Sequence, residues 1–198
     1  METIQKLRNQ TGAGIMDVKN ALDEAGGDVE KAHEILRKRG AAVSQKKADR
    51  EAGEGVVMSY THMGRIGVLV ELNCETDFVA RTDDFQNLAK DIAMQVASMN
   101  PLYVSMDDIP AEVLEKEREI ALAQIEGDKP EDVKAKIIEG KVAKYAKEIS
   151  LLEQPFFRED SMTVRQLIEA AVGKMNENIQ VRRFVRFALD DAAKGGNA

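Results

Sequence analysis

The chain contains 198 residues, of which 43% are hydrophobic and 32% are charged, the composition of a soluble globular protein with one sizeable core or two small domains. Its net charge of −7 opposes non-specific binding to nucleic acid or anionic lipid, because both need a concentrated positive surface. With two histidines and one cysteine, the chain has too few soft ligands for a structural zinc site.

Residues 1–40 are predicted to form a compact three-helix module. Two glycines within residues 11–14 separate the first helix from the second, Asp28 is placed to cap the third, and Gly40 stands where a helix ends. Apolar spacings of three and four give the core residues Ile4, Leu7, Ile15, Val18, Leu22, Val29, Ala32 and Leu36. Three helices of this size bury little surface, which indicates a binding module.

A linker and a β-hairpin are expected next. Residues 41–54 lack apolar periodicity and are rich in charge, so they read as a linker that can begin as helix. The pattern then changes to β-branched strands over residues 56–60 and 66–72, joined by a glycine-containing turn at 62–65.

The remaining pattern alternates helices with short strands. We expect a helix capped by Asp83 or Asp84 that ends at Asn100-Pro101, and another that runs from Pro110 to about Ile125. The other expected elements are a strand at 102–104, a turn at 127–130, a helix at about 163–172 and a strand at 179–188.

An apolar seam marks a further helix, with residues Ile138, Val142, Tyr145, Ile149 and Leu152 at alternating spacings of four and three. The seam is too short for a long rod, so the expected helix packs on the sheet or on another chain. The fold class is therefore α+β, with a small, mainly antiparallel sheet packed with helices. The predicted divisions are a module at 1–40, a linker at 41–54, a core domain at 55–190 and a flexible tail at 191–198.

No catalytic group is indicated. His33 and His62 have no serine or cysteine partner suggested by spacing, and Cys74 at a strand end reads as buried filler. No phosphate-cradling loop of the Gly-x4-Gly-Lys-Ser/Thr type occurs, so no direct nucleotide binding is expected. The sequence thus predicts a protein that is not an enzyme, needs no cofactor and holds no metal.

A cytoplasmic location is expected as well. No apolar run approaches the roughly 18 residues that cross a bilayer, and the N-terminus lacks a signal pattern. Cys74 alone cannot form an intrachain disulfide, which favours a reducing compartment. Basic clusters at 37–39, 46–47 and 182–183 are not interleaved with stacking aromatic residues, so no nucleic-acid or membrane contact is predicted.

The segment Glu75-Thr76-Asp77-Phe78-Val79 follows an apolar strand directly, and its Thr-Asp pair favours a turn. In one interpretation, Phe78 folds back into the core and Asp77 caps the next helix. In the other, the phenylalanine is displayed beside a carboxylate as an anchor for a protein partner. Spacing alone leaves both interpretations open.

Three stretches resemble a known family, elongation factor Ts. They are residues 7–22 (LRNQTGAGIMDVKNAL), residues 64–80 (GRIGVLVELNCETDFVA) and residues 151–156 (LLEQPF). They occur in the family's order across nearly the whole chain. One small departure is that Ile15 and Val18 stand where the family often has methionine and cysteine, and both remain apolar.

The resemblance implies a guanine nucleotide exchange factor that binds elongation factor Tu–GDP and promotes GDP release by disturbing the magnesium site, in support of translation elongation. It implies that the N-terminal module has a ubiquitin-associated-like fold. The residues that it assigns to partner binding are Arg8, Met16 and Lys19 in the module, and Thr76, Asp77, Phe78 and Val79 in the intruding segment. Short members of the family can work as homodimers, so a homodimer is a further expectation.

Two other functions are compatible with the residues alone. An adaptor would use the N-terminal module to recognise a peptide or ubiquitin-like partner, with the second domain as support. An enzyme with an unrecognised pocket would turn over a small molecule without any partner. The exchange-factor hypothesis differs from both, because it makes Phe78 essential to an effect on a second protein.

Overall fold

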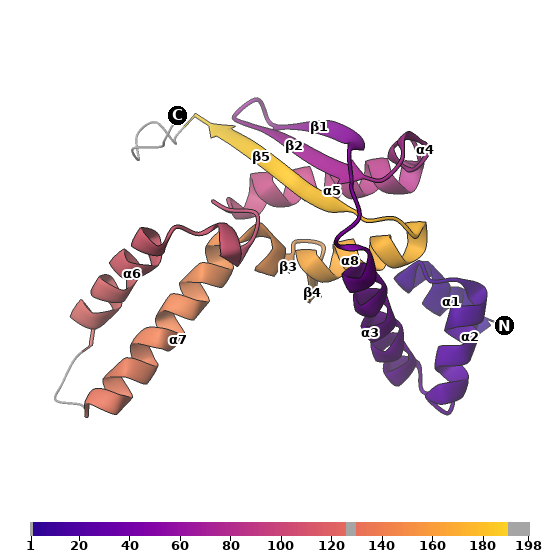
Figure 1. The fold of residues 1–198 in the computed structure, drawn as a ribbon, viewed down its shortest axis with the longest axis horizontal. Coiled ribbons are helices and arrows are strands. Elements are labelled where there is room, and N and C mark those ends of the chain that lie inside the picture. The colour runs from indigo at the N-terminus through magenta and orange to yellow at the C-terminus, as the bar shows by residue number, and fades with distance from the viewer. Residues whose placement is uncertain (1, 126–129, 190–198) are drawn as a thin grey trace. The chain divides into compact units, whose positions relative to one another are not determined.

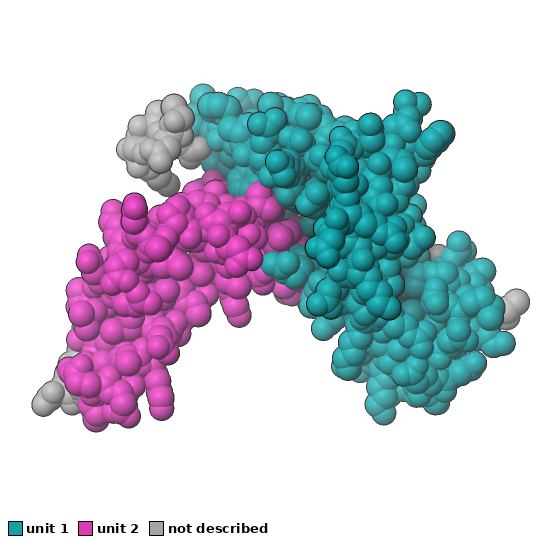
Figure 2. All heavy atoms as spheres, viewed as in Figure 1, with its two compact units in different colours: residues 1–97, 165–198 teal, residues 98–164 magenta. Residues whose placement is uncertain are grey.

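The structure is a computed structural model that describes residues 2–125 and 130–189. It divides into two compact units, unit 1 at residues 1–97 and 165–198 and unit 2 at residues 98–164 (Figure 2). Unit 1 holds three N-terminal helices and a three-stranded antiparallel sheet, and unit 2 holds a helical hairpin and a two-stranded sheet (Figure 1). The predicted α+β class is confirmed.

The first three helices, α1 (Glu2–Thr11), α2 (Ile15–Glu24) and α3 (Val29–Lys47), pack on one another. Asp28 caps α3 as predicted, since its carboxylate accepts hydrogen bonds from the Glu30 and Lys31 amides at 3.0 and 3.1 Å. The buried core consists of Leu7, Val18, Ala21, Leu22, Ala32 and Leu36. Most of the predicted core positions are therefore confirmed.

The predicted end of the third helix at Gly40 is wrong, because α3 continues to Lys47. Gly40 lies inside the helix where α3 approaches α8 (Val164–Met175). A Cβ on Gly40 would lie 3.5 Å from the Glu169 carbonyl oxygen, and one on Gly173 would lie 3.6 Å from the Cα of Gly40. The absence of a side chain at Gly40 thus allows α3 and α8 to approach closely, and Gly40 does not end a helix.

The sheet of unit 1 has the order β1-β2-β5, with β1 at Glu54–His62, β2 at Ile66–Cys74 and β5 at Gln180–Ala188. Met63 and Gly64 both have positive φ, 49° and 66°, in the predicted turn of the β1–β2 hairpin. Alternate residues of β2 are buried, namely Val68, Val70, Leu72 and Cys74. One sheet face is therefore covered and the other is open.

Helix α5 (Asp83–Met99) supplies much of the core of unit 1 and carries the predicted apolar stripe, with Phe85, Leu88, Ile92 and Val96 buried. The prediction that Asp83 or Asp84 caps this helix is wrong. The cap is Thr82, whose hydroxyl accepts a hydrogen bond from the Phe85 amide at 3.3 Å. The short helix α4 (Asp77–Ala80) lies between β2 and α5 in the chain.

Unit 2 is built around the helices α6 (Ala111–Ala123) and α7 (Glu131–Ile149), which pack on each other. Its shorter elements are η1 (Met106–Asp108), η2 (Leu151–Glu153), β3 (Pro155–Phe156) and β4 (Glu159–Thr163). Two residues of the apolar seam predicted to pack on the sheet or on another chain, Tyr145 and Ile149, pack instead with α6 and the loop before it. Leu152, the last predicted member, lies beyond the end of α7 in η2. The buried cluster consists of Ile109, Ala146 and Ile149, flanked by Tyr103, Val113, Leu114 and Tyr145.

Several predicted boundaries need correction or lie outside the described residues. The expected strand at 102–104 is reduced to one parallel bridge between Tyr103 and Ser150. Most of the turn at 127–130 and all of the tail at 191–198 fall outside the described part of the chain. The divisions at 40/41 and 54/55 concern the interior of unit 1 and stay a prediction. Within residues 2–125 and 130–189, no helix has both the length and the apolar character needed to cross a membrane.

Among the glycines in the described part of the chain, Gly55 has the least room for a side chain. Its φ is +151°, and a Cβ there would lie 2.2 Å from the Leu72 carbonyl oxygen, inside the β1–β2 pairing. Gly55→Ala should therefore lower the free energy of unfolding by about 2–4 kcal/mol, measured by urea denaturation. Gly53→Ala is the matched control, because a Cβ at Gly53 meets nothing within 4 Å. Equal stability of the two variants would contradict the described strand pairing.

Candidate functional site

The predicted partner-binding segment forms a single helical turn just after β2. Thr76 is the N-cap of α4, with extended backbone angles, and its hydroxyl accepts a hydrogen bond from the Val79 amide at 3.4 Å. Thr82 closes the other end, because its hydroxyl donates to the Val79 carbonyl at 2.8 Å. The segment is therefore a defined turn between two threonines and not an irregular loop.

Phe78 projects from this turn with 79% of its surface exposed. The interpretation that placed its ring in the core is therefore wrong. The residue of the turn that packs in the core is Ala80, which is buried. Its carbonyl accepts a hydrogen bond from the Gln86 side chain at 2.7 Å. Asp77 forms an ion pair with Arg81 at 2.9 Å, and Val79 is half-buried. The exposed ring agrees with the other interpretation, in which Phe78 is displayed beside a carboxylate.

Two glutamates tie the start of the turn to the start of β5. The Glu177 carboxylate accepts hydrogen bonds from the Glu75 amide (3.1 Å), the Thr76 amide (3.0 Å) and the Thr76 hydroxyl (2.6 Å). In return, the Glu75 carboxylate accepts the Asn178 amide at 2.7 Å. Each glutamate thus holds the backbone of the other's segment, and such bonds to a charged acceptor are stronger than neutral ones.

The sheet register explains why these residues meet. β2 and β5 are antiparallel, and Asn73 pairs with Gln180, so extending the register places Thr76 opposite Glu177. Asn176 ends α8 with a positive φ of 57° and turns the chain toward β5. The two glutamates bind where the strands separate, and their side chains replace the backbone ladder there.

The end of α3 joins the same cluster. Lys47 is only 6% exposed, and its ammonium donates to the Asn176 carbonyl at 2.8 Å. The Asn178 side chain donates to the Arg50 carbonyl at 2.7 Å, and Arg50 contacts the Glu75 carboxylate at 3.5 Å. Lys47 and Arg50, which belong to the predicted linker at 41–54, are therefore held beside the turn by hydrogen bonds.

The electrostatics of the cluster favour the ionised form of Glu75. The Asn178 amide, with smaller contributions from Arg50 and Lys47, lowers the pKa of Glu75 below its ordinary value of 4.5. Burial has the opposite effect on the neighbouring thiol, since desolvation, with Glu177 nearby, raises the pKa of Cys74 to about 11. Cys74 also has no exposed surface, as expected for inert filler.

The second predicted group lies on the N-terminal helices. Met16 is 65% exposed, and Arg8 and Lys19 are exposed as well. Ile15, predicted to be buried, is 55% exposed, because it sits in the first turn of α2 at the edge of the stripe that Val18 and Leu22 define. At 100° per residue, Ile15, Met16 and Lys19 fall within an arc of about 100° on α2.

Sequence reasoning missed two contributors to these sites. The exposure of Ile15 could have been predicted from the sequence. Ala21 and Ala25 belong to the core side of α2, so the centre of that side lies away from Ile15. No sequence pattern indicated that Glu177 binds the turn, because its hydrogen-bond partners lie about a hundred positions earlier in the chain. Within the described part of the chain, no hydrogen bond or ion pair joins the turn to Arg8, Met16 or Lys19.

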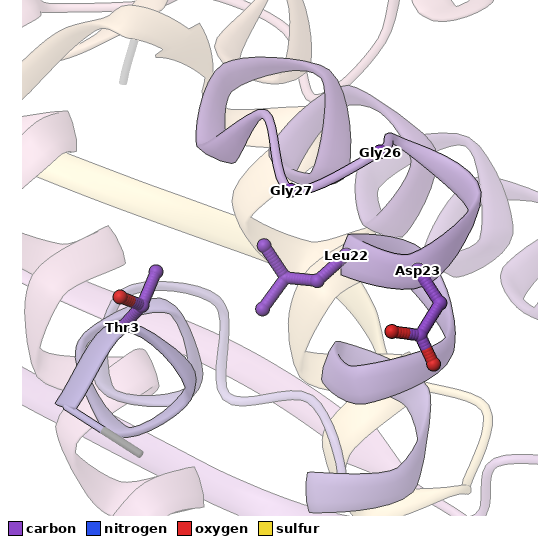
Figure 3. A pocket seen from close by; sticks show the side chains of 5 residues that line it. All are labelled: Thr3, Leu22, Asp23, Gly26 and Gly27. Carbon is purple, nitrogen blue, oxygen red and sulfur yellow. The ribbon is translucent and has the colours of Figure 1, made fainter.

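A shallow hollow lies between α1 and the end of α2, lined by Thr3, Leu22, Asp23, Gly26 and Gly27 (Figure 3). None of these residues belongs to either predicted group, and the charged member of the lining is Asp23. Among the residues that the structure describes, no group of three or more histidine, cysteine or acidic side chains is placed to hold a metal ion.

Comparison with known proteins covers almost the entire chain. The family model described as "Elongation factor TS" matches residues 2–191. A protein named elongation factor Ts from Thermotoga petrophila is 56% identical over 192 residues, 96% of both chains. Those from Thermodesulfovibrio yellowstonii and Thermotoga maritima are each 55% identical, covering 95% and 96% of this chain and 94% and 96% of their own lengths.

The lowered pKa of Glu75 predicts a pH-dependent contribution to stability. A carboxylate whose pKa is lower in the folded state stabilises the fold above its ordinary value of 4.5, and this stabilisation is lost as the pH falls through the folded value. Glu75→Gln should thus be less stable than wild type at pH 7, with a difference that shrinks below pH 4.5. Urea midpoints at several pH values measure this.

The control for this experiment is Glu51→Gln. Glu51 is exposed and makes no hydrogen bond or ion pair within the described residues. Its substitution should leave the urea midpoint unchanged at every pH. A stability difference for Glu75→Gln that stays constant from pH 7 to pH 3.5 would show that the carboxylate is not preferentially ionised in the fold.

Proposed function

The chain belongs to the elongation factor Ts family, whose role is nucleotide exchange on elongation factor Tu, and on this premise we propose how its two surfaces act. The α4 turn intrudes into the GTPase and disturbs the magnesium site beside bound GDP. The surface around Met16 docks the N-terminal helices on the same partner. The observation that carries the proposal is Phe78, exposed at the tip of a turn whose backbone is held on both sides.

The exposed ring supplies affinity where it is needed. Burying a phenylalanine side chain in a partner pocket contributes roughly 1.5–3 kcal/mol. Phe78 gives nothing comparable to the free chain, because most of its surface is in water. That free energy is therefore available to stabilise the conformation of the partner that receives the ring.

Linkage converts this binding into nucleotide release. If the partner conformation that accepts Phe78 holds GDP poorly, then GDP and this chain each weaken the binding of the other by the same factor. Magnesium neutralises the diphosphate, so a disturbed magnesium site removes a large electrostatic contribution to GDP binding. No bond is made or broken by this chain, so the proposed function is not an enzymatic turnover of substrate.

The docking surface combines apolar and basic groups on rigid helices. Ile15 and Met16 offer exposed apolar side chains at the start of α2, while Arg8 and Lys19 add positive charge. The opposite side of α2 is buried through Val18, so the surface is presented without further ordering. We assign this surface to affinity and the α4 turn to the disturbance of the nucleotide site.

We further propose that the chain forms a homodimer through the open face of its sheet. Val57, Leu69, Val185 and Phe187 are between 40% and 70% exposed. Leu69 pairs directly with Val185 across β2 and β5, and the strand alternation places all four on the face opposite Val70. Apolar surface of this kind marks an interface, and one sheet face can pack on its own copy around a two-fold axis.

The proposed location is the cytoplasm. The partner GTPase serves translation elongation, and the free thiol of Cys74 suits a reducing compartment. Neither a nucleotide nor a membrane is needed for the proposed action on the partner.

Exchange kinetics separate the two proposed surfaces. Phe78→Ala should lower the maximal rate of labelled GDP release from elongation factor Tu about 10- to 100-fold, from the roughly 1.5–3 kcal/mol lost. Met16→Ala should instead raise the half-saturating concentration of this chain. Met63→Ala, an equally conservative truncation of a side chain that is 85% exposed, is the control. A Phe78→Ala variant with the wild-type rate would refute the intruding role.

Sedimentation equilibrium tests the homodimer. The wild-type chain should sediment as a dimer at micromolar concentration, and Phe187→Glu should raise the dimer dissociation constant by at least about tenfold, since each interface gains two buried charges. Leu122→Glu, on a residue of α6 that is 55% exposed, should leave the dimer intact. A monomeric wild-type chain at these concentrations would rule the dimer out.

A further inference from the structure

We propose that Glu177 is a positioning residue for nucleotide exchange, which acts on the partner through Phe78 and without contacting the partner itself. The inference rests on the proposed function of the α4 turn. It concerns a residue about a hundred positions away in the chain, outside all three stretches that resemble the family. The carboxylate of Glu177 receives three hydrogen bonds from the two residues that lead into the turn.

Glu177 accepts the two backbone amides that lead into the turn. The pairing of β2 with β1 ends at Cys74, so the amides of Glu75 and Thr76 lie beyond the strand ladder. One carboxylate oxygen of Glu177 accepts both amides, at 3.1 and 3.0 Å. Without that acceptor, both amides would turn to water, and the backbone leading into α4 would keep only the bond from the Asn178 amide to the Glu75 carboxylate as a hydrogen bond to the segment before β5.

Glu177 also binds the Thr76 hydroxyl. Its proton goes to the other oxygen of Glu177 at 2.6 Å, which leaves the hydroxyl oxygen to accept the Val79 amide. Glu177 thereby orients the cap that begins the helical turn carrying Phe78. A helix of four residues has too few internal hydrogen bonds to be stable alone, so its geometry depends on such caps.

Little of the chain packs around the ring of Phe78, which is 79% exposed. The position of its Cβ, and with it the set of directions open to the ring, is therefore fixed by the backbone of α4. Glu177 is itself well placed, since it lies between Asn176, whose carbonyl accepts Lys47, and Asn178, whose amide binds Glu75. A change at Glu177 therefore reaches the ring through the turn and leaves the docking surface on α2 as it is.

The experiment measures GDP release from elongation factor Tu with Glu177→Ala. The maximal rate should fall about tenfold, as expected when an anchor is loosely positioned, while the half-saturating concentration changes much less. Glu177→Gln keeps one acceptor oxygen but faces three donors with an amide, so its rate should be intermediate. Glu119→Ala, which removes an exposed charge from α6, should match wild type.

A double variant distinguishes positioning from general damage. If Glu177 acts through Phe78, then Glu177→Ala should reduce the rate less than about twofold in the Phe78→Ala background, because coupled residues are not additive. Fully additive effects would overturn the proposal, as would a wild-type exchange rate for Glu177→Ala.

Amide measurements on the free chain provide an independent readout. In Glu177→Ala, the amides of Glu75 and Thr76 should exchange with solvent at least about tenfold faster, while the amide of Val70 inside the sheet keeps its protection. Unchanged exchange at Thr76 would overturn the proposal, and Glu177→Gln serves if the alanine variant does not fold. Failure of the wild-type chain to release GDP would refute the proposed function, whereas the amide result would still decide whether Glu177 holds the turn.

Discussion

At the end of the sheet, β2 and β5 stop exchanging backbone hydrogen bonds and begin to exchange side-chain ones. Glu75 binds the amide of Asn178, and Glu177 binds the amides of Glu75 and Thr76. This reciprocal pair stabilises the point from which α4, the end of α8 and residues 47–50 all depart. A carboxylate suits each position because it only accepts hydrogen bonds, and its partners there are donors.

The pair helps to hold the backbone that carries Phe78, while the ring itself lies in water. A phenylalanine in a loose loop would collapse onto nearby apolar surface or sample many directions, and binding would then have to order it. Here the order of the backbone is present beforehand, because the threonine caps and the buried Ala80 hold the turn. The surface on α2 follows the same principle, with Met16 exposed on a helix whose other side is packed.

The connection between the N-terminal helices and the sheet is firmer than a charged, aperiodic stretch suggests. α3 runs on to Lys47, crosses α8 closely where Gly40 meets Gly173, and ends with a buried ammonium on the Asn176 carbonyl. The ammonium needs such a partner, because a buried charge without a hydrogen bond is strongly unfavourable. The region between α2 and the α4 turn is thus packed structure over much of its length.

Local pattern in the sequence determined most of the elements: the apolar spacings of α2, α3 and α5, the glycine turn of the hairpin and the Asp28 cap all depend on neighbours a few residues apart. The family motifs likewise directed attention to the segment around Phe78 as the expected partner-binding segment. Only the tertiary structure decided that Phe78 is exposed, that α3 passes through Gly40, that Ile15 lies outside the core and that two residues of the predicted apolar seam pack with α6 and the loop before it. Glu177 is the clearest case, because a hydrogen bond between residues a hundred positions apart leaves no periodicity in the chain. It exists because antiparallel pairing of β2 with β5 brings those two segments to the same end of the sheet.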